Sequence, residues 1–485
     1  IEQQQPIVIE QQQPIVIQQQ QQVVIQQQTM KRVLFIGAIA FSVAAQAQSS
    51  VVYNMLSSDG GMGSARYMAL GGALGALGND ASAAADNPAG IGTYRSSELQ
   101  IDWQGGLMTR QDPTRIQIPN ISYVHVMPVA KGYQLNGFFA FQNDSWSGNQ
   151  WQSIESNPTE RMVDQWLNAS QGINGPDELL SAGLLGAYTA YQGYVLEYDE
   201  NNNEFFDLSQ GLPSQRVTRI KQGFQSNRLV AGASLRTPQL SLGLSRSYSN
   251  ASAFEALVVD EDGFSGYTSG YTYSQSDSMS ISGTSSSLGV IFRLPLDLQA
   301  GMRISMPNVA SLDWYSRYRM TARTTNNDPP FELTDKQTWE TLPGVSAAFS
   351  LAKKFQSKGF IAVEYHRKSL PEQTIISPIS AIGIGQDLLD DLVVVEGVRV
   401  GMEWRKGPLA YRFGYQQSNA GTQFKDHSGF QRGSVGLGYR SDQASIHVAL
   451  VSNYRQARIY NPTTSDLWTV NALQHQLVIG VNFRV

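Results

Sequence analysis

The chain has 485 residues, a formal net charge of −5 and no cysteine, and only 15% of its residues are charged. The lack of cysteine excludes disulfides, thiolate metal sites, cysteine nucleophiles and an acylated lipoprotein cysteine. The acidic balance offers no basic surface for nucleic acid, and 44 glycines with 21 tyrosines do not suggest a helix-rich soluble enzyme.

The first 47 residues are predicted to lie outside the mature fold. Residues 1–29 are a glutamine-rich repeat that builds no core. We interpret it as a leader upstream of the true initiator Met30, with a functional tether as the alternative. Residues 30–47 combine a basic start, a short apolar run and the small-x-small cleavage site Ala45-Gln46-Ala47, the order of an export signal peptide. The mature chain is then expected to begin at Gln48.

A stretch of very small residues follows, from Ser64 to Tyr94. Small side chains let a helix and its turns fit a narrow lumen, and Asn79 or Asp80 can cap the turn that follows. We predict an N-terminal hatch, or plug, over residues 48–97. The alternative is that these residues only fill space.

From residue 98 onward, apolar and polar residues alternate, which predicts strands with one apolar and one polar face. A soluble sandwich also alternates, but its apolar face lies inside. Here the polar faces combine charges with glycine, which suits a crowded lumen, and the apolar faces are rich in aromatics, which suits lipid. In residues 398–405, for example, Val398, Val400, Met402 and Trp404 alternate with Arg399, Gly401, Glu403 and Arg405.

The strand segments number fourteen, and their connections alternate between tight and long. Short periplasmic turns, long external loops and an even strand count are typical of bacterial outer-membrane barrels. We therefore predict an all-β fold over residues 98–485, a transmembrane antiparallel β-barrel of about 14 strands. The segments are 99–108, 116–128, 133–143, 217–237, 239–249, 269–294, 297–325, 333–354, 359–368, 394–405, 408–418, 430–440, 444–455 and 472–485.

One segment is too long for a bilayer. At about 3.3 Å per residue, residues 297–325 would extend about 90 Å, so part of the segment must stand outside the membrane or be broken. Proline cannot donate a hydrogen bond to a ladder, which places the expected break at Pro307-Asn308.

The largest external insertion, about residues 144–216, is predicted to contain amphipathic helices. Asn157-Pro158-Thr159-Glu160 reads as one helix start and Asp177-Glu178 as another. The helices either form a cap that packs on itself or offer a groove that first captures an apolar ligand. The candidate capture residues are Trp166, Leu167, Leu184, Leu185 and Tyr188. Residues 376–393 could form a further helix of this kind.

The sequence holds little catalytic signal. It has no G-x-S-x-G, H-E-x-x-H, P-loop or G-x-G-x-x-G match, and its five histidines are scattered over separate segments. We predict no enzymatic activity, no cofactor and no metal. A serine and histidine assembled across strands, as in a membrane phospholipase, is the open alternative.

Residues 65–90 resemble the N-terminal signature of the FadL/TodX family of outer-membrane transporters for long-chain fatty acids and other hydrophobic compounds. The family pattern is a small-residue run with Gly-Gly, then Asp-Ala-Ser-Ala, then Asn-Pro-Ala-Gly. The matching residues are Gly71, Gly72, Asp80, Ala81, Ser82, Ala83, Asn87, Pro88, Ala89 and Gly90.

The resemblance implies a function and its parts. In the family a hatch blocks the barrel, and its movement lets the ligand leave sideways through a gap at a kink in the third strand, for which Asn136-Gly137 is the candidate. The expected partners are outer-membrane lipid, a hydrophobic ligand such as a fatty acid and, at the C-terminal strand, the assembly machinery. The expected location is the outer membrane of a Gram-negative bacterium.

A rival reading is a scaffold, because the same barrel type also serves as a subunit of a protein secretion system. Four arginines predicted to face the lumen are equally a structural charge ladder or partners for a ligand carboxylate. They are Arg399, Arg412, Arg440 and Arg484.

Overall fold

The computed structural model describes most of the chain from residue 63 onward. The predicted leader and signal peptide, and most of the predicted helix at 376–393, lie outside the described residues. Within the described part, no helix combines the length and the apolar character needed to cross a membrane. The described ranges are 63–107, 116–370, 374–377, 392–421, 429–460 and 467–485.

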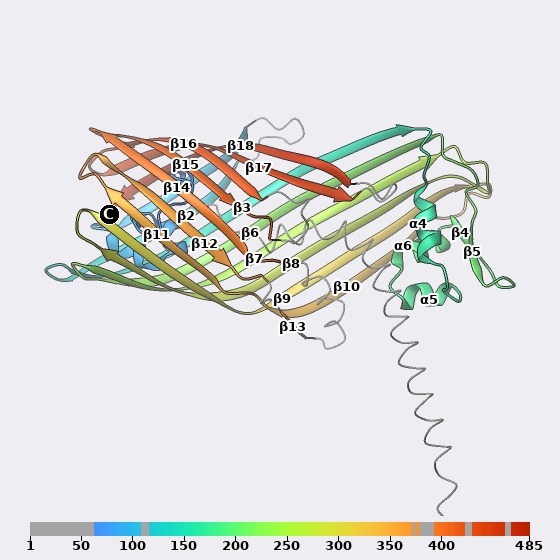
Figure 1. Ribbon diagram of the computed structural model, residues 1–485, viewed down its shortest axis with the longest axis horizontal. Coiled ribbons are helices and arrows are strands. Elements are labelled where there is room, and N and C mark those ends of the chain that lie inside the picture. The colour runs from blue at the N-terminus through green and yellow to red at the C-terminus, as the bar shows by residue number, and fades with distance from the viewer. Residues whose placement is uncertain (1–62, 108–115, 371–373, 378–391, 422–428, 461–466) are drawn as a thin grey trace, which may run out of the picture.

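The strands form one closed antiparallel barrel (Figure 1). The main sheet has sixteen strands, and the pairing of β9 with β11 closes a ring of fourteen of them. The other two are β10, which continues beyond β11 along the same side of β9, and β13, which pairs with β10. The predicted fold class and strand count are confirmed. The barrel strands are β1 (Glu98–Leu107), β2 (Gln117–Ala130), β3 (Tyr133–Ser156), β6 (Gln215–Arg236), β7 (Leu240–Asp262), β8 (Thr268–Arg293), β9 (Leu298–Thr324), β11 (Ser346–Lys354), β12 (Gly359–Lys368), β14 (Val395–Lys406), β15 (Leu409–Ser418), β16 (Phe430–Arg440), β17 (Ala444–Tyr460) and β18 (Leu467–Arg484).

The predicted segment 333–354 is two strands, β10 (Phe331–Leu342) and β11. Both pair with β9, and in one register, because Thr341 faces Ala310 and Ser346 faces Ser305. Pro343, Gly344 and Val345 separate the two strands in the sequence. No ladder pairs are assigned between residues 306–309 and 342–345, and we call these two described stretches the seam.

The other neighbour of β9 is also irregular at this height. Its ladder with β8 shifts register between Gly283 and Ser285, so Asn308 and Val309 have no assigned pair on that side either. The break predicted at Pro307-Asn308 is therefore a local loss of ladder pairing within a strand that otherwise continues to Thr324.

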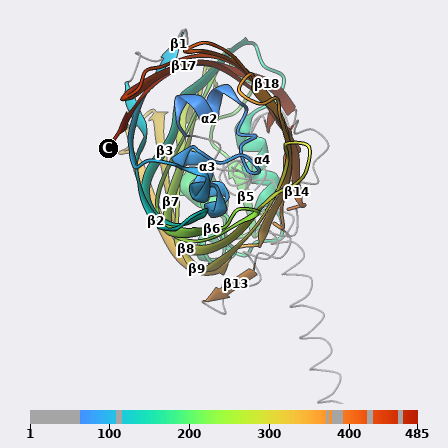
Figure 2. The same ribbon diagram turned by 90° about the vertical axis from the view of Figure 1, so that its left-hand side faces the viewer.

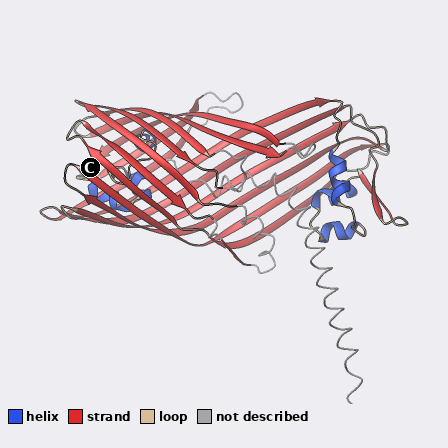
Figure 3. Ribbon diagram, in the orientation of Figure 1, coloured by secondary structure: helices blue, strands red, loops and turns tan. Residues whose placement is uncertain are grey.

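The barrel is tall on one side and short on the other. Strand β9 has 27 residues and β8 has 26, whereas β11 has 9 and β15 has 10. Figure 1 shows the green and yellow strands running far beyond the orange ones, and Figure 3 shows the same uneven height in its strands. The strand β13 (Thr374–Ser377) pairs with the lower end of β10.

A small lobe stands at the far end of the tall side, between β3 and β6 (Figure 1). Strand β3 continues to Ser156, so the insertion begins later than the predicted residue 144. Two short strands, which the sequence analysis did not predict, pair within the lobe. The lobe contains α4 (Met162–Ala169), α5 (Pro176–Ser181), α6 (Leu185–Gln192), β4 (Leu196–Asp199) and β5 (Glu204–Asp207).

The strands turn their apolar residues outward. In β14, Val400 and Trp404 are 37% and 49% exposed, whereas Arg399 and Glu403 between them are 1% and 0% exposed. The alternation therefore has the orientation predicted for a barrel with a polar lumen, and it excludes the apolar interior of a soluble sandwich.

Residues 63–97, which we call the lumenal segment, lie inside this ring of strands. Figure 2 looks into the end of the barrel that carries the C-terminus and shows the helices surrounded by the wall. Almost every residue from Ser64 to Tyr94 is buried. The segment contains α2 (Ala65–Ala69), α3 (Ala81–Asp86) and the 3-10 helix η1 (Pro88–Thr93).

Candidate functional site

Three polar caps shape the lumenal segment. Ser64 precedes α2, Asp80 precedes α3 and Asn87 precedes η1, and each side chain accepts a backbone N–H from the first turn that follows it. Pro88 occupies the first position of η1, where its missing N–H leaves no hydrogen bond unmade. The three short helices therefore begin at defined positions.

The caps are also tied to one another. The Ser64 hydroxyl donates to the Asp80 carboxylate at 2.7 Å, and the Ser64 backbone N–H donates to Ser82 Oγ at 2.7 Å. Asn87 Nδ2 donates to the Gly75 carbonyl at 2.8 Å. Residues from both helices and the intervening loop thus form one connected unit.

Two glycine pairs let the segment pack tightly. Gly71 and Gly72 have φ values of 59° and 80°, a backbone conformation that side chains disfavour, and a Cβ on Gly71 would lie 2.8 Å from the backbone nitrogen of Tyr415 in the wall. Gly90 packs directly on Gly78 within the segment.

The wall has matching glycines where η1 touches it. A Cβ on Gly243 of β7 would collide with the backbone of Pro88 and Ala89, and one on Gly289 of β8 would collide with the Asn87 side chain. Asn87 Nδ2 also lies 3.4 Å from the Val290 carbonyl of β8. The signature tetrapeptide that begins at Asn87 is therefore in direct contact with strands β7 and β8.

A buried ionic cluster joins the end of α3 to the wall. Arg399 Nη1 lies 3.1 Å from Asp86 Oδ2 and 2.9 Å from Glu364 Oε1. The Tyr67 hydroxyl donates to Asp86, and burial raises the pKa of Tyr67 well above its usual value, so the hydroxyl keeps its proton. Arg228 of β6 donates to the Ala85 carbonyl at 3.0 Å.

A second cluster lies beside α2. Glu403 of β14 is fully buried. Its carboxylate accepts hydrogen bonds from Arg412 Nε at 2.7 Å, Arg405 Nε at 2.6 Å and Arg66 Nε at 3.5 Å. Three guanidinium groups therefore share one carboxylate. Breaking a buried ion pair is costly because it leaves a charge without its partner, so both clusters hold the lumenal segment in place.

The third-strand residues are paired normally. Asn136 faces Val126 and Ser234, and Gly137 faces His125 and Ala233, with no shift of register at either residue in the ladders that the structure describes. The interruption that we expected at this pair is absent from those ladders. Asn136 Nδ2 instead donates to the Ile91 carbonyl of η1 at 2.8 Å, so it anchors the lumenal segment.

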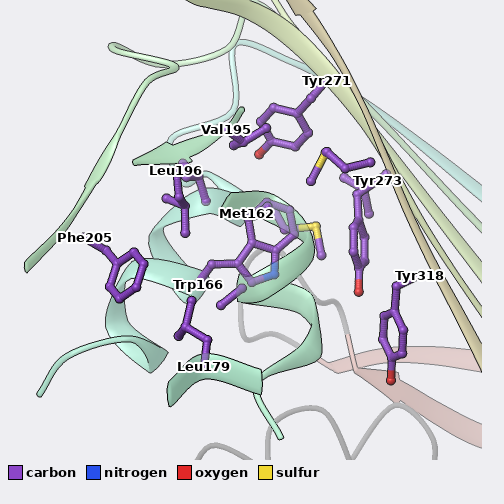
Figure 4. Packing of buried hydrophobic residues seen from close by; sticks show 14 of the residues in the cluster. Met162, Trp166, Leu179, Val195, Leu196, Phe205, Tyr271, Tyr273 and Tyr318 are labelled. Carbon is purple, nitrogen blue, oxygen red and sulfur yellow. The ribbon is translucent and has the colours of Figure 1, made fainter. Parts of the chain in front are cut away.

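The external residues proposed for ligand capture belong to the lobe's core. Trp166 is buried against Tyr271 and Tyr273 of the tall wall, at ring distances of 5.8 and 5.1 Å (Figure 4). The remaining four, which are half-buried, pack on the same cluster: Leu167, Leu184, Leu185 and Tyr188. These contacts fit the alternative in which the lobe is a packed cap.

Sequence reasoning missed the acidic and aromatic members of the two clusters, namely Tyr67, Asp86, Glu364 and Glu403 as ion-pair partners. It predicted that Arg399 and Arg412 face the lumen, and both do. The missed carboxylates had a signal, because Glu364 and Glu403 occupy inward positions in alternating strands. A carboxylate at such a position needs a cation nearby.

Solved structures with this architecture share little sequence with the chain. A structure of the toluene transporter TodX from Pseudomonas putida matches with a TM-score of 0.53 and 12% identity, over 89% of this chain and 99% of that one. A second TodX structure matches with a TM-score of 0.50 and 12% identity, over 87% and 98%. A FadL homologue from Pseudomonas aeruginosa matches with a TM-score of 0.51 and 11% identity, over 87% and 98%.

A comparison with protein-family models and a comparison with curated protein sequences both return no match. At 11–12% identity the structural matches bear on architecture, and they extend over nearly the whole length of each solved chain. The fourteen-stranded closure and the matches agree with the resemblance first noted in residues 65–90. The chain therefore has the FadL/TodX-type barrel fold.

Proposed function

We propose that this chain is an outer-membrane channel that carries hydrophobic small molecules inward, with the lumenal segment as its hatch. Long-chain fatty acids are the ligand class that the sequence resemblance favours. The observation that carries the proposal is a closed barrel with an apolar outer face whose lumen is filled by a segment of small residues. The solved TodX structures are of a toluene transporter, which supports an apolar ligand.

The outer face supports a membrane location. Large apolar side chains are exposed on strand after strand. A soluble protein rarely exposes so large an apolar surface to water. Lipid satisfies this surface, because a closed barrel pairs its strands and presents only side chains outward. Examples are Leu244, Ile304, Phe349, Val400, Phe413, Leu437 and Ile479.

Hatch gating is tested by loosening the η1 contact. Asn87→Ala removes the cap of η1 and the bonds to Gly75 and Val290. In cells that lack their own fatty acid transporter, this variant should take up labelled oleate at an altered rate while its barrel still assembles. Uptake equal to that of the unmodified chain would count against gating.

Transport itself is tested by deleting the gene. Uptake of labelled oleate and of a neutral aromatic should both fall, and re-expression should restore them. Unchanged uptake of both compounds, together with lost secretion of other proteins, would favour the scaffold alternative.

We further propose that uncharged ligands leave sideways, through the seam between β9 and β10–β11. An apolar molecule gains free energy by entering lipid directly and avoids the aqueous mouth of the barrel. The seam is the described place where β9 loses assigned pairs on both sides. Met306 and Val345 lie on its outward face and are both exposed.

Closing the seam with a reversible bond tests this route. Cysteines in place of Met306 and Val345 should, once oxidised, slow uptake of a neutral aromatic, and a reductant should restore it. The matched control replaces Leu351 and Val363, which face each other in an unbroken ladder. A formed disulfide in the seam that leaves uptake unchanged would exclude this exit.

A further inference from the structure

One rim of the barrel carries a regular set of cations. Seven strands end at the rim that holds the C-terminus, and six of them place a lysine or arginine at their last inward-facing position. The seventh strand, β2, does not, but Arg95 stands at the same rim, three residues before the start of β1. We call this set the rim ring: Arg95, Arg236, Arg293, Lys354, Arg405, Arg440 and Arg484.

Six members of the rim ring stand on every second strand of the barrel, so neighbouring members lie two strands apart. At about 4.8 Å between adjacent strands, that spacing is about 10 Å. Arg293 also donates to the Thr237 carbonyl at 2.9 Å, one residue after Arg236. Like charges gathered around one opening destabilise the fold unless a counter-charge fills it.

The protein supplies few counter-charges at this rim. Glu98 of β1 faces Arg484 in the ladder, and Arg405 pairs with Glu403, which two other arginines already share. Asp297 and Asp442 stand in turns of the same rim. The positive charge of the rim is therefore only partly balanced.

The arc formed by Arg236, Arg293 and Lys354 is the least balanced part. Among the described residues, no carboxylate lies within 4.0 Å of these three side chains. Arg236 donates to the Gln134 amide at 3.3 Å, and Arg293 donates to Ser241 Oγ at 2.7 Å. These acceptors are neutral, so no carboxylate of the described residues is paired with the arc.

We propose that the rim ring holds the anionic head group of a single-chain amphiphile at this mouth of the barrel. The inference rests on the proposed function and adds a ligand class to it. The six strand members of the ring stand at inward positions, and Arg236, Arg293 and Lys354 are partly buried there, which suits a small head group within the mouth better than the surface of a docked protein.

The ring offers a charged head group contacts that a neutral ligand cannot use. Burying an ionised head group away from water is costly unless it is paired, and the ring supplies the pairing cations. Arginine and lysine form strong charge-assisted hydrogen bonds with carboxylates. The ring lies just beyond η1, since Ser241, which accepts from Arg293, also contacts Gly92. A head group that passes the hatch therefore meets the ring next.

The test compares dodecanoate with dodecanol, which has the same chain length and no charge. Equilibrium dialysis uses the full chain in lipid nanodiscs, with empty nanodiscs as the blank. The Arg236→Gln, Arg293→Gln, Lys354→Gln triple variant should lower the dodecanoate-to-dodecanol affinity ratio by about tenfold, the usual scale for lost hydrogen bonds to a charged group. Raising the ionic strength should lower the ratio of the unmodified chain as well.

The matched control removes three cations from the same end that do not face the lumen. Lys131 and Lys358 lie in turns, and Lys406 lies on the outward face of β14. Replacing these three with glutamine changes the net charge equally and should leave the ratio unchanged. Native assembly of each variant is checked by its heat-modifiable migration in a gel, and single substitutions replace any triple variant that fails to assemble.

Four results would overturn the proposal. Two concern the variants: an unchanged ratio in the rim variant, or an equal fall in both triple variants. The third is displacement of dodecanoate by acetate at the same concentration, which would indicate a site for any free anion. The fourth is equal binding of dodecanoate and dodecanol to the unmodified chain, which would leave hydrophobic transport standing. Failure to bind either compound would instead count against the proposed function.

Discussion

Asp86 is the residue on which the contact between α3 and the wall depends most. Its carboxylate accepts from Tyr67 and pairs with Arg399, and Arg228 lies 3.9 Å away. Asp86→Asn removes one of the two carboxylates that Arg399 pairs with and the carboxylate near Arg228, and it should destabilise the lumenal segment by about 3 kcal/mol. Amide hydrogen exchange within residues 65–93 should accelerate accordingly.

The control for this prediction is an ion pair at the surface. Glu332 pairs with Arg317 at 2.7 Å, and both side chains are exposed. Glu332→Gln should leave exchange in the lumenal segment unchanged, because exposed pairs contribute little. Equal exchange rates in Asp86→Asn and the unmodified chain would show that the buried cluster does not hold the segment.

The close fit between Gly243 and η1 leads to a prediction that depends only on side-chain size. An added methyl group would collide with the backbone of Pro88 and Ala89, so Gly243→Ala should push η1 away from β7 and raise the permeability of the barrel to apolar compounds. Gly106→Ala is the control, since a Cβ there meets nothing within 4 Å. Uptake assays on cells that carry either variant distinguish the two, and a matching rise in both variants would contradict a specific contact.

At this scale the sequence could predict the caps but not their distant partners. Asp80 and Asn87 are recognisable because a short polar side chain before a run of small residues is a local signal. The pairing of Asp86 with Arg399 joins residues more than 300 positions apart, and strand alternation shows only that Arg399 faces inward. Which carboxylate it meets depends on how far the lumenal segment enters the barrel.

Among the elements, the lobe of α4–α6 depends on one aromatic side chain. Trp166 is 7% exposed and contacts two tyrosines of the wall. Trp166→Ala should destabilise the lobe by about 3–5 kcal/mol and make it susceptible to limited proteolysis while the barrel remains intact. Leu180→Ala, at a position 44% exposed in α5, should leave cleavage unchanged. A resistant Trp166→Ala lobe would mean that its packing is not what keeps it folded.

Strands were easier to predict than the elements between them. Alternation repeats in every barrel strand, so all fourteen could be counted. The second predicted helix is two, α5 and α6, because Gly183 takes a left-handed φ of 75° between them. The β4–β5 hairpin was missed although Asn201-Asn202-Asn203 is a turn signal, since each of its strands has only four residues.

For the whole molecule, the barrel and its contents should be separable. Every barrel strand pairs with two neighbours in the ring, and the lumenal segment supplies none of these ladders. A chain lacking residues 65–93 should therefore still assemble, with a higher single-channel conductance in planar bilayers. The emptied lumen would place Arg399 and Glu403 in water. Failure of this chain to assemble would show that the segment is part of what folds the barrel.

The overall architecture was predictable because a membrane barrel imposes one pattern on every strand. The uneven height was not fully predictable. Strand β7 runs on to Asp262, well past the predicted end at residue 249, because its outer part packs against the lobe instead of lipid. Burial there makes inward positions apolar, as at Leu257 and Val259, and this inverts the pattern on which the prediction relied.

The shared register of β10 and β11 has a mechanical consequence. Four residues lie between Thr341 and Ser346, and four lie between Ser305 and Ala310, so the two halves of the interrupted strand are already in phase. Closing the seam would require new hydrogen bonds over a few residues and no sliding of one strand past another. An open and a closed wall would then differ only in the few hydrogen bonds across the seam. The change between them could occur without disturbing the strands on either side.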